Sequence, residues 1–374
     1  LHLLSRRQRQ MCIRDRNRGV VAIFKRDRFD KYSNFARIGN GSLGGKGRGL
    51  AFIDAMIKRN PTFDNIEGVN VTVPKTVVLC TDIFDTFMES NNLYQIALSD
   101  ISDEEILEHF LKAKLPEELK PDFLAFFDVV GKPIAVRSSS LLEDSHYQPF
   151  AGIYSTYMIP SLDDKNEMLR LLLDAIKAVY ASVFYADSKA YMTATSNVID
   201  QEKMAIILQE VVGTQYNDRY YPSFAGVGRS INYYPINDEK AEDGVVDLAI
   251  GLGKYIVDGG RSLRFSPRHP NKVLQTSTLD LALRDTQTRF YALDMNRGEK
   301  PFSIDDGFNL LKLSVRDAEK DNSLRLMVST YDPVDQMIRD GYYDGGRKVV
   351  TFANILQHEA FPLASILDSM LTIG

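Results

Sequence analysis

The stretch from Val136 to Thr156, which reads VRSSSLLEDSHYQPFAGIYST, constrains this chain more than any other. An apolar strand ends in an arginine and three serines, an acidic pair follows, and a small-residue turn with Ala151 and Gly152 comes next. Arginine suits bidentate contact with phosphate, and serine hydroxyls and a glycine-bearing loop offer further donors. The pattern indicates a polyphosphate ligand, while a capped, solvated loop is the alternative interpretation of the same residues.

A second glycine-rich stretch, NGSLGGKGRGLAFIDAMIKR, contains Gly44, Gly45 and Lys46. We expect a glycine loop that runs into an amphipathic helix, with an apolar side containing Phe52 and Met56. Free backbone N–H groups and the positive end of a helix dipole attract anions, and the lysine adds a point charge. The GxxxxGK[ST] spacing of a Walker loop is absent. A flexible turn with a solvated lysine is the alternative here.

Together with three further blocks, these stretches resemble the N-terminal nucleotide-binding region shared by phosphoenolpyruvate synthase and pyruvate phosphate dikinase. The blocks follow the family's order between about Ser33 and about Pro270. They are the GGKG loop, VPKTVVLCTDIFDTFM, the VRSSS block, MAIILQEVV and IGLGKYIVDGGRSLRF. The resemblance implies an ATP-grasp fold of the mixed α+β class, with two lobes, of which the second is incomplete in this chain.

The resemblance also implies roles for individual residues. Lys46 and Arg137 match the catalytic lysine and arginine that contact the ATP phosphates. The loops around those phosphates correspond to Gly44, Gly45, Ala151, Gly152 and Thr156. The hinge that hydrogen-bonds the adenine edge, mainly through its backbone, corresponds to Gln209, Glu210, Val211 and Val212. The apolar run before this hinge predicts a buried strand, whose exit suits a flat, amphipathic base.

Some positions depart from the family's pattern or carry no assignment. Lys254 follows Gly-Leu-Gly where the family usually has an acid, so no role is carried over to it. Glu143 and Asp144 lie close to Arg137 in the sequence, and we expect them to pair with that arginine or cap a turn rather than hold a metal. The family uses Mg²⁺ with ATP, and the resemblance places its ligands beyond Gly374. No residue of this chain is therefore assigned to a metal.

The two ends of the chain need separate interpretations. Residues 1–18 hold six arginines against one acid and begin without Met, which fits a targeting segment, a basic nucleic-acid arm or translated sequencing-adapter read-through. We favour the last and exclude them from fold reasoning. We expect residues 19–200 to form the first lobe and residues 201–374 the second. The family's phosphohistidine and pyruvate-binding domains would follow Gly374, so we expect a fragment of a larger enzyme.

Composition limits the function classes. The net charge of −5 and the lack of zinc-like Cys/His spacing argue against a nucleic-acid surface. The sequence has no run of about 18 apolar residues, so we expect no membrane span and, by default, a cytoplasmic location. Cys80 lies in an apolar segment and is expected to be a reduced core residue.

Periodicity predicts several elements outside these blocks. Residues 71–81 and 204–212 are typical of strands. Ser102 and Glu105 predict a capping box at a helix start, and an apolar stripe from Leu169 to Phe184 predicts a long core-facing helix. The charged segments from Asp238 to Gly244 and from Asp317 to Asn322 are interpreted as solvated connections.

Three functions are compatible with these residues. The first is the ATP-binding part of a pyruvate, water dikinase, which passes a phosphoryl group to a histidine on a downstream domain and makes phosphoenolpyruvate. The second is a related dikinase that phosphorylates another acceptor, such as a glucan or an antibiotic. The third is a non-catalytic nucleotide-sensing module. We favour the first, and we expect the fragment alone to be inactive.

Overall fold

The computed structural model describes residues 21–27, 29, 34–64, 66–141, 152–194, 202–296 and 302–373. Contacts divide the chain into two compact units, which are described separately below. Unit 1 comprises residues 1–211 and 297–308, and unit 2 comprises residues 212–296 and 309–374. The boundary expected at residues 200 and 201 falls before strand β6 (Met204–Glu210), whereas β6 is hydrogen-bonded on both sides within the sheet of unit 1.

Unit 1 is built on a six-stranded mixed sheet in the order β1-β2-β3-β6-β4-β5. The first three strands are parallel, and β6, β4 and β5 each run antiparallel to their neighbours. The remaining strands are β1 (Ala22–Ile23), β2 (Phe35–Ile38), β3 (Thr76–Leu79), β4 (Ile134–Ser140) and β5 (Thr156–Ile159). Strand β6 is buried from its first residue to Gln209, as its continuous apolar run predicted, and it ends two residues earlier than expected.

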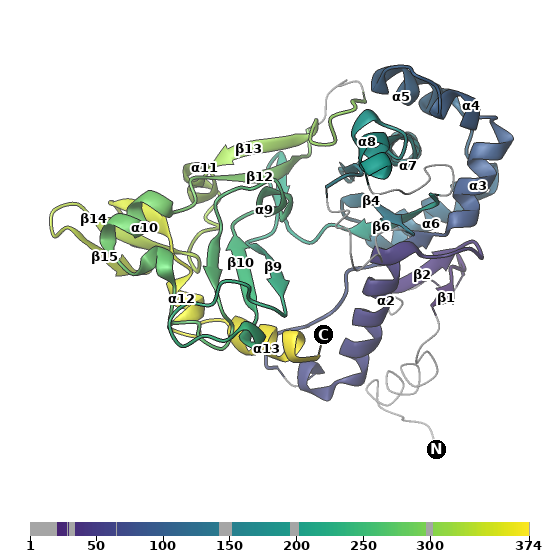
Figure 1. Ribbon diagram of the computed structural model, residues 1–374. Coiled ribbons are helices and arrows are strands. Elements are labelled where there is room, and N and C mark those ends of the chain that lie inside the picture. The colour runs from purple at the N-terminus through teal and green to yellow at the C-terminus, as the bar shows by residue number, and fades with distance from the viewer. Residues whose placement is uncertain are drawn as a thin grey trace. The chain divides into compact units, whose positions relative to one another are not determined.

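Helices lie on both faces of this sheet (Figure 1). Val77 and Leu79 of β3 belong to a large core formed with the helices of one face. Val78 points the other way, and a Cβ on Gly47 would lie 3.6 Å from its Cγ1. Helix α2 (Gly44–Arg59) therefore covers the second face. The other helices are α3 (Thr81–Ser90), α4 (Tyr94–Ala97), α5 (Asp103–Lys112), α6 (Lys120–Val130), α7 (Lys165–Ser182) and α8 (Ala186–Ala194).

Two of these helices confirm the sequence predictions. In the capping box of α5, the Glu105 backbone N–H donates to Ser102 Oγ at 3.2 Å and the Ser102 N–H donates to the Glu105 carboxylate at 3.0 Å. Such a cap typically stabilises a helix by about 1 kcal/mol. Helix α7 buries the predicted stripe, including Leu172, Ile176 and Val179, in the core of unit 1.

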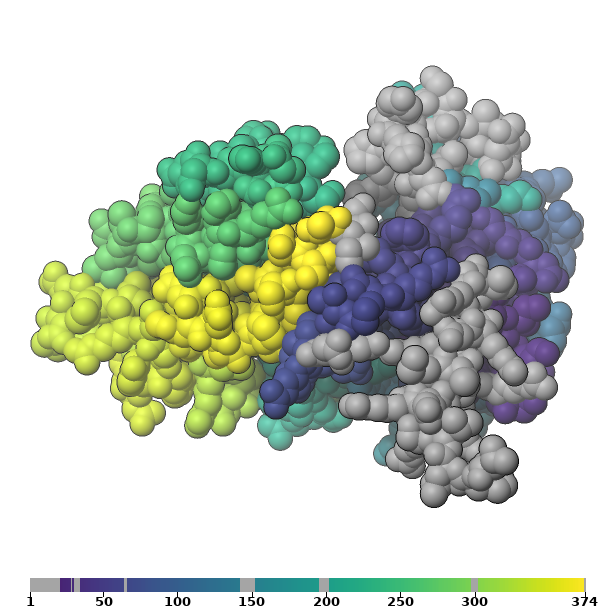
Figure 2. Space-filling view, turned by 90° about the horizontal axis from the view of Figure 1, so that it is seen from below, coloured from purple at the N-terminus to yellow at the C-terminus, as the bar shows by residue number. Residues whose placement is uncertain are grey.

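Helix α2 buries only part of the apolar side that the sequence predicts, which also included Ile53, Ala55 and Ile57. Phe52 is 61% exposed on this surface helix, which is dark blue in Figure 2, and Met56 is only partly buried. The buried residues are Gly44, Gly47 and Ile57. Glycines have no side chain, so they let the helix backbone approach the sheet closely. The apolar periodicity located the helix and included the buried Ile57, but it missed the buried glycines, because glycine does not count as an apolar residue in such a pattern.

Unit 2 contains antiparallel sheets with the orders β13-β12-β8-β7, β11-β10-β9 and β15-β14-β16. The strands are β7 (Thr214–Tyr216), β8 (Arg219–Tyr221), β9 (Ala225–Arg229), β10 (Val245–Ala249), β11 (Leu263–Phe265), β12 (Arg289–Asp294), β13 (Leu310–Ser314), β14 (Val328–Asp332), β15 (Met337–Asp340) and β16 (Arg347–Val350). The helices are α9 (Lys254–Val257), α10 (Leu279–Asp285), α11 (Val315–Lys320), α12 (Ala353–Leu356) and α13 (Leu363–Ile373). The mixed α+β class is therefore confirmed and is consistent with an ATP-grasp-type fold.

One charged segment that we interpreted as a solvated connection is partly helical. Residues 317–320 belong to helix α11, which begins with a capping box. The backbone N–H and hydroxyl of Ser314 donate to the Asp317 carboxylate at 3.0 and 2.7 Å. Val315 and Ala318 are buried, and their packing against the rest of unit 2 stabilises this short helix.

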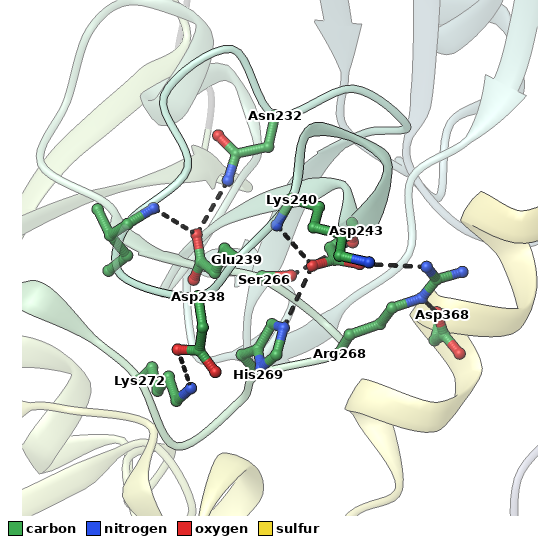
Figure 3. A network of polar contacts seen from close by, with 11 residues as sticks. Asn232, Asp238, Glu239, Lys240, Asp243, Ser266, Arg268, His269, Lys272 and Asp368 are labelled. Carbon is green, nitrogen blue, oxygen red and sulfur yellow. Dashed lines mark hydrogen bonds and ion pairs between the residues drawn. The ribbon is translucent and has the colours of Figure 1, made fainter.

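The other charged segment supplies a buried acid. Asp243 is 8% exposed and accepts hydrogen bonds from the Lys240 backbone N–H at 2.8 Å and from Arg268 at 3.1 Å (Figure 3). A ring nitrogen of His269 lies 3.2 Å from the same carboxylate. Arg268 also pairs with Asp368 of helix α13 at 2.9 Å, which ties this helix to the loop. The interpretation as a solvated connection holds for exposed residues such as Asp238 but was wrong for Asp243, because this acid is held by partners distant in the sequence.

Two predictions from composition can be compared with the structure. Cys80 is fully buried with a free thiol, as expected, and burial raises the pKa of this thiol above its ordinary value. In the part of the chain that the structure describes, no helix combines the length and the hydropathy that are needed to cross a membrane.

Candidate functional site

The glycine-rich segment forms the first turn of helix α2 rather than a loop before it. The helix begins at Gly44, so Lys46 lies in its first turn. Gly44 has a φ of +67°, and a Cβ at this position would lie 1.9 Å from the carbonyl oxygen of Ser139 in β4. Any other residue would clash with the strand and adopt a strained backbone. The segment thus requires glycine for its packing, independently of any ligand.

Serines of β4 bind the helix start directly. The Gly47 backbone N–H donates to Ser139 Oγ at 2.9 Å, and that hydroxyl donates to the Leu43 carbonyl oxygen at 2.8 Å. Lys46 Nζ donates to Ser138 Oγ at 3.1 Å, across 92 residues of sequence. These serines are fully buried, and their hydroxyls bond within the protein. They are therefore structural at this point, whereas we had expected them to donate to phosphate.

Arg137 is on β4, which lies between two strands that carry expected site residues. Strand β5 carries Thr156 of the phosphate loops, and β6 carries Gln209 and Glu210 of the adenine hinge. Arg137 is partly buried, and its Nη1 donates to Gln209 Oε1 of β6 at 2.9 Å. Gln209 Nε2 in turn donates to Thr76 Oγ1 of β3 at 3.1 Å. This chain of hydrogen bonds crosses three neighbouring strands and fixes the orientation of the guanidinium group. The expected adenine hinge therefore begins beside Arg137, and its glutamine side chain contacts that arginine.

Thr156 is brought next to Arg137 by the strand register. The two residues are directly opposite each other in the antiparallel pair of β4 and β5, where facing Cβ atoms lie about 4.5–5.5 Å apart. The Thr156 backbone N–H donates to the Asp306 carboxylate at 2.8 Å. Gly152 is exposed with a φ of +81°, and Ala151 lies outside the described residues. The structure thus pairs Thr156 with Arg137 at the middle of β4 and bonds Lys46 to the next residue of that strand, Ser138.

The rest of the expected hinge has part of its backbone already occupied. The Glu210 N–H donates to the Lys75 carbonyl oxygen, and the Val211 N–H donates to the Pro133 carbonyl oxygen, both at 2.9 Å. These two amides cannot also donate to a base. Val212 is 55% exposed and is the accessible member of the four hinge residues.

Several residues support this site without any signal in the sequence analysis. Asp82 accepts from the backbone N–H groups of Asn40 and Gly41 at 2.8 and 3.0 Å, which holds the turn before α2. Glu202 is 1% exposed and accepts from Ser140 Oγ at 2.8 Å. Burial raises the pKa of the Glu202 carboxyl, and its hydrogen bonds offset this only in part. Each of these contacts joins segments far apart in the chain, so no local sequence motif predicts them.

Three further positions named in the sequence analysis are not assigned to the site. Lys254 forms an ion pair with Asp258 one helical turn later, at 3.1 Å. Glu143 and Asp144 lie outside the described residues.

The described residues do not supply a recognisable metal site. Among them, no group of three or more His, Cys, Asp or Glu side chains could hold a metal ion. Carboxylate and carbonyl oxygens are the ligands that Mg²⁺ prefers. We therefore assign no Mg²⁺ ligand in the described part of the chain and derive no step through this ion.

Comparison with known proteins identifies a family model and two relatives that match parts of this chain. A family model described as the pyruvate phosphate dikinase AMP/ATP-binding domain matches residues 40–319. A Bacillus subtilis protein named uncharacterized phosphotransferase YvkC is 27% identical over 190 residues, which are 50% of this chain and 20% of that protein. A phosphoenolpyruvate synthase from Aeropyrum pernix is 30% identical over 127 residues, which are 34% of this chain and 13% of the synthase. The chain thus spans at most about a fifth of the length of these relatives.

Proposed function

This chain belongs to the pyruvate phosphate dikinase AMP/ATP-binding domain family, and we propose that it is the ATP-binding part of a phosphoenolpyruvate synthase-like kinase. Lys46 and Arg137 hold the phosphates, with Gly44, Gly45, Ala151, Gly152 and Thr156 in the surrounding loops. The adenine edge is bound at the strand exit formed by Gln209, Glu210, Val211 and Val212. The names of the two relatives support phosphoryl transfer as the reaction class.

The observation that carries this proposal is the interlocking of the two sequence blocks. Lys46 Nζ donates to Ser138, which is the direct neighbour of Arg137 on β4. One cationic side chain is thereby bound to the strand residue that follows the other, and the lysine lies in the first turn of a 16-residue helix. Fixed positive charge stabilises the negative charge that gathers on phosphate oxygens during transfer. The helix start adds its partial positive charge in the same place.

In this scheme ATP gives up two phosphoryl groups and leaves AMP. One passes to a histidine on a further domain and from there to pyruvate, and the other is transferred to water and released as phosphate. Over the full reaction, ATP, pyruvate and water give AMP, phosphate and phosphoenolpyruvate. In this scheme Lys46 and Arg137 bind and orient the phosphates and neutralise their charge. Mg²⁺, when bound with ATP, would add neutralising charge between the phosphates.

Calorimetric titration of the chain with ATP tests this proposal. Alanine at Lys46 or at Arg137 removes one charge-assisted phosphate contact, so each change should weaken binding by about 1.5–3 kcal/mol, or roughly ten- to a hundredfold. Arg137→Lys should also weaken binding, because an ammonium group cannot reproduce the bidentate fork of a guanidinium.

Lys58→Ala is the matched control for these variants. Lys58 lies in the last turn of the same helix and pairs with Asp54 at 2.5 Å, away from the helix start. Its removal should leave the ATP affinity unchanged. Equal affinities for the wild type, Lys46→Ala and Arg137→Ala would contradict the proposed phosphate site.

A further inference from the structure

Glu202 is a buried carboxyl group directly before β6 that bonds the ends of two other strands. It accepts from the Ser140 hydroxyl at 2.8 Å, the Tyr154 hydroxyl at 3.2 Å and the Lys203 backbone N–H at 3.1 Å. Ser140 is the last residue of β4, and Tyr154 lies two residues before β5. One carboxyl group therefore joins the end of the strand that carries Arg137 to the start of the strand that carries Thr156.

The residues that follow Tyr154 are held by two further elements. The Ser155 backbone N–H donates to Ser182 Oγ of α7 at 3.3 Å. The next backbone N–H, of Thr156, donates to Asp306 at 2.8 Å. Three consecutive residues are thus each bonded to a different part of unit 1. Such support fixes the position of a short segment more tightly than strand pairing alone.

We propose that Glu202 is a positioning residue that sets the place of Thr156 relative to Arg137 in the phosphate site. The inference rests on the proposed function and adds a residue that the family resemblance does not assign. Glu202 acts through Ser140 and Tyr154 and does not itself contact the nucleotide.

The chemistry of a buried carboxyl group supports this role. Removing such a group from water costs free energy unless hydrogen bonds replace its hydration. Here two hydroxyls and a backbone amide provide them, and both hydroxyls come from segments that flank the expected phosphate contacts. An apolar side chain of similar size would fill the space without defining the distance between the two segments. The carboxyl group therefore fixes the distance between the Ser140 and Tyr154 segments, which packing alone does not fix.

Titration with ATP and with adenosine tests the role, using the whole chain under conditions where circular dichroism shows it folded. Glu202→Ala should weaken ATP binding by roughly tenfold, because the phosphate contacts lose their relative position. Glu202→Gln keeps the shape and most of the hydrogen bonds, so it should stay within about threefold of the wild type. Adenosine lacks phosphates, so its affinity should be the same for all three proteins.

A core variant separates positioning from loss of stability. Ile106 is fully buried on α5, away from β4 and β5, so Ile106→Ala should destabilise unit 1 without changing the ATP affinity. Hydrogen exchange supplies a readout that needs no nucleotide. Exchange of the Ser155 and Thr156 amides should become faster in Glu202→Ala than in Ile106→Ala.

The outcomes distinguish this inference from the proposed function. If the wild type does not bind ATP, the proposed function fails, and the nucleotide role of Glu202 fails with it. If the wild type binds ATP and Glu202→Ala binds it equally well, only the positioning role is overturned. An equal loss for adenosine, or an equal loss in Ile106→Ala, would also overturn it. Faster exchange of the Ser155 and Thr156 amides in Glu202→Ala, together with a loss of affinity that is confined to ATP, supports the inference.

Discussion

Two buried carboxyl groups, one in each unit, have opposite ionisation behaviour. Glu202 in unit 1 is 1% exposed and Asp243 in unit 2 is 8% exposed. Desolvation by burial raises the pKa of Glu202, and its hydroxyl and amide partners, which lower the pKa, offset this only in part. The pKa of Asp243 is lowered, first by the Lys240 backbone N–H and then by Arg268 and His269. Burial alone therefore does not decide the charge of an acid in this protein, and the nature of its partners does.

The interactions that hold the surroundings of these two acids also differ in kind. The end of β4 is held by close backbone packing at Gly44 and by hydrogen bonds to buried serines. The Asp243 network is held by charged partners, some of which are partly exposed. Steric changes should therefore damage the first region most, whereas changes of charge, pH and salt should affect the two regions in different directions.

The largest effect is expected from Gly44→Ala. The added methyl group would lie 1.9 Å from the Ser139 carbonyl oxygen at a left-handed backbone position. Strain and displacement of the strand should lower the free energy of unfolding by at least about 3 kcal/mol, as measured by urea denaturation.

Gly49→Ala in the same helix provides the control. A Cβ at Gly49 would meet no atom within 4 Å, so this change should raise stability by up to about 1 kcal/mol through helix propensity. Similar losses for the two variants would show that the close approach of α2 to β4 is not what makes Gly44 necessary.

Asp243→Asn should have the next largest effect. The amide keeps the shape but loses the charge that faces Arg268 and His269, so stability should fall by about 2 kcal/mol. Asp238→Asn, in the same loop, alters an exposed ion pair with Lys272 and should leave stability unchanged within error. If the two variants behaved alike, the contrast between buried and solvated acids in this loop would be lost.

The pH dependence of stability should separate Glu202 from Asp243. Because folding raises the pKa of Glu202, its contribution is fully present below about pH 4.5 and is lost as the pH rises through the folded-state value. The stability of the wild type relative to Glu202→Gln should then fall with rising pH, by at most about 1.4 kcal/mol per pH unit.

Asp243 should show the opposite sign. Its folded-state pKa is lowered, so its contribution is present above its ordinary value of 3.8 and is lost as the pH falls through the folded-state value. Denaturation of the wild type, Asp243→Asn and Glu202→Gln across this range measures both. Difference curves with the same sign would contradict the comparison.

The smallest effect is expected from salt. Raising the ionic strength from 0.1 to 1 M shortens the Debye length from about 10 Å to about 3 Å. The stability difference between the wild type and Asp243→Asn should shrink, because part of the interaction with Arg268 is screened. The difference between the wild type and Glu202→Gln at low pH should stay constant, since it involves no charged pair.

Local patterns in the sequence predicted the elements whose structure depends on nearby residues. The capping box of Ser102 and Glu105 and the buried stripe of α7 could be read directly, because both lie within a few helical turns. The helix at Asp317 was missed although a local signal existed, since Ser314 and Asp317 have the spacing of a capping box.

The candidate site was predictable only in part. Sequence resemblance predicted Lys46, Arg137 and Thr156 as site residues, and the structure pairs Thr156 with Arg137 and bonds Lys46 to the neighbouring Ser138. The contacts of Ser139 and Glu202 could not be predicted, because a hydrogen bond between distant segments leaves no periodicity or fixed spacing. The same reason explains the wrong interpretation of Asp243, whose strongest side-chain partners come from another loop.

The buried serines of β4 also affect how relatives of this chain should be recognised. Ser139 is needed to dock helix α2, whether or not a nucleotide is ever bound. A related protein that had lost its reaction would still need this serine and Gly44 in order to fold. A search for the glycine and serine motifs therefore detects the scaffold. Under the proposed function, substitution of Lys46 or Arg137 within an otherwise intact motif is the change that would mark a relative with a different activity.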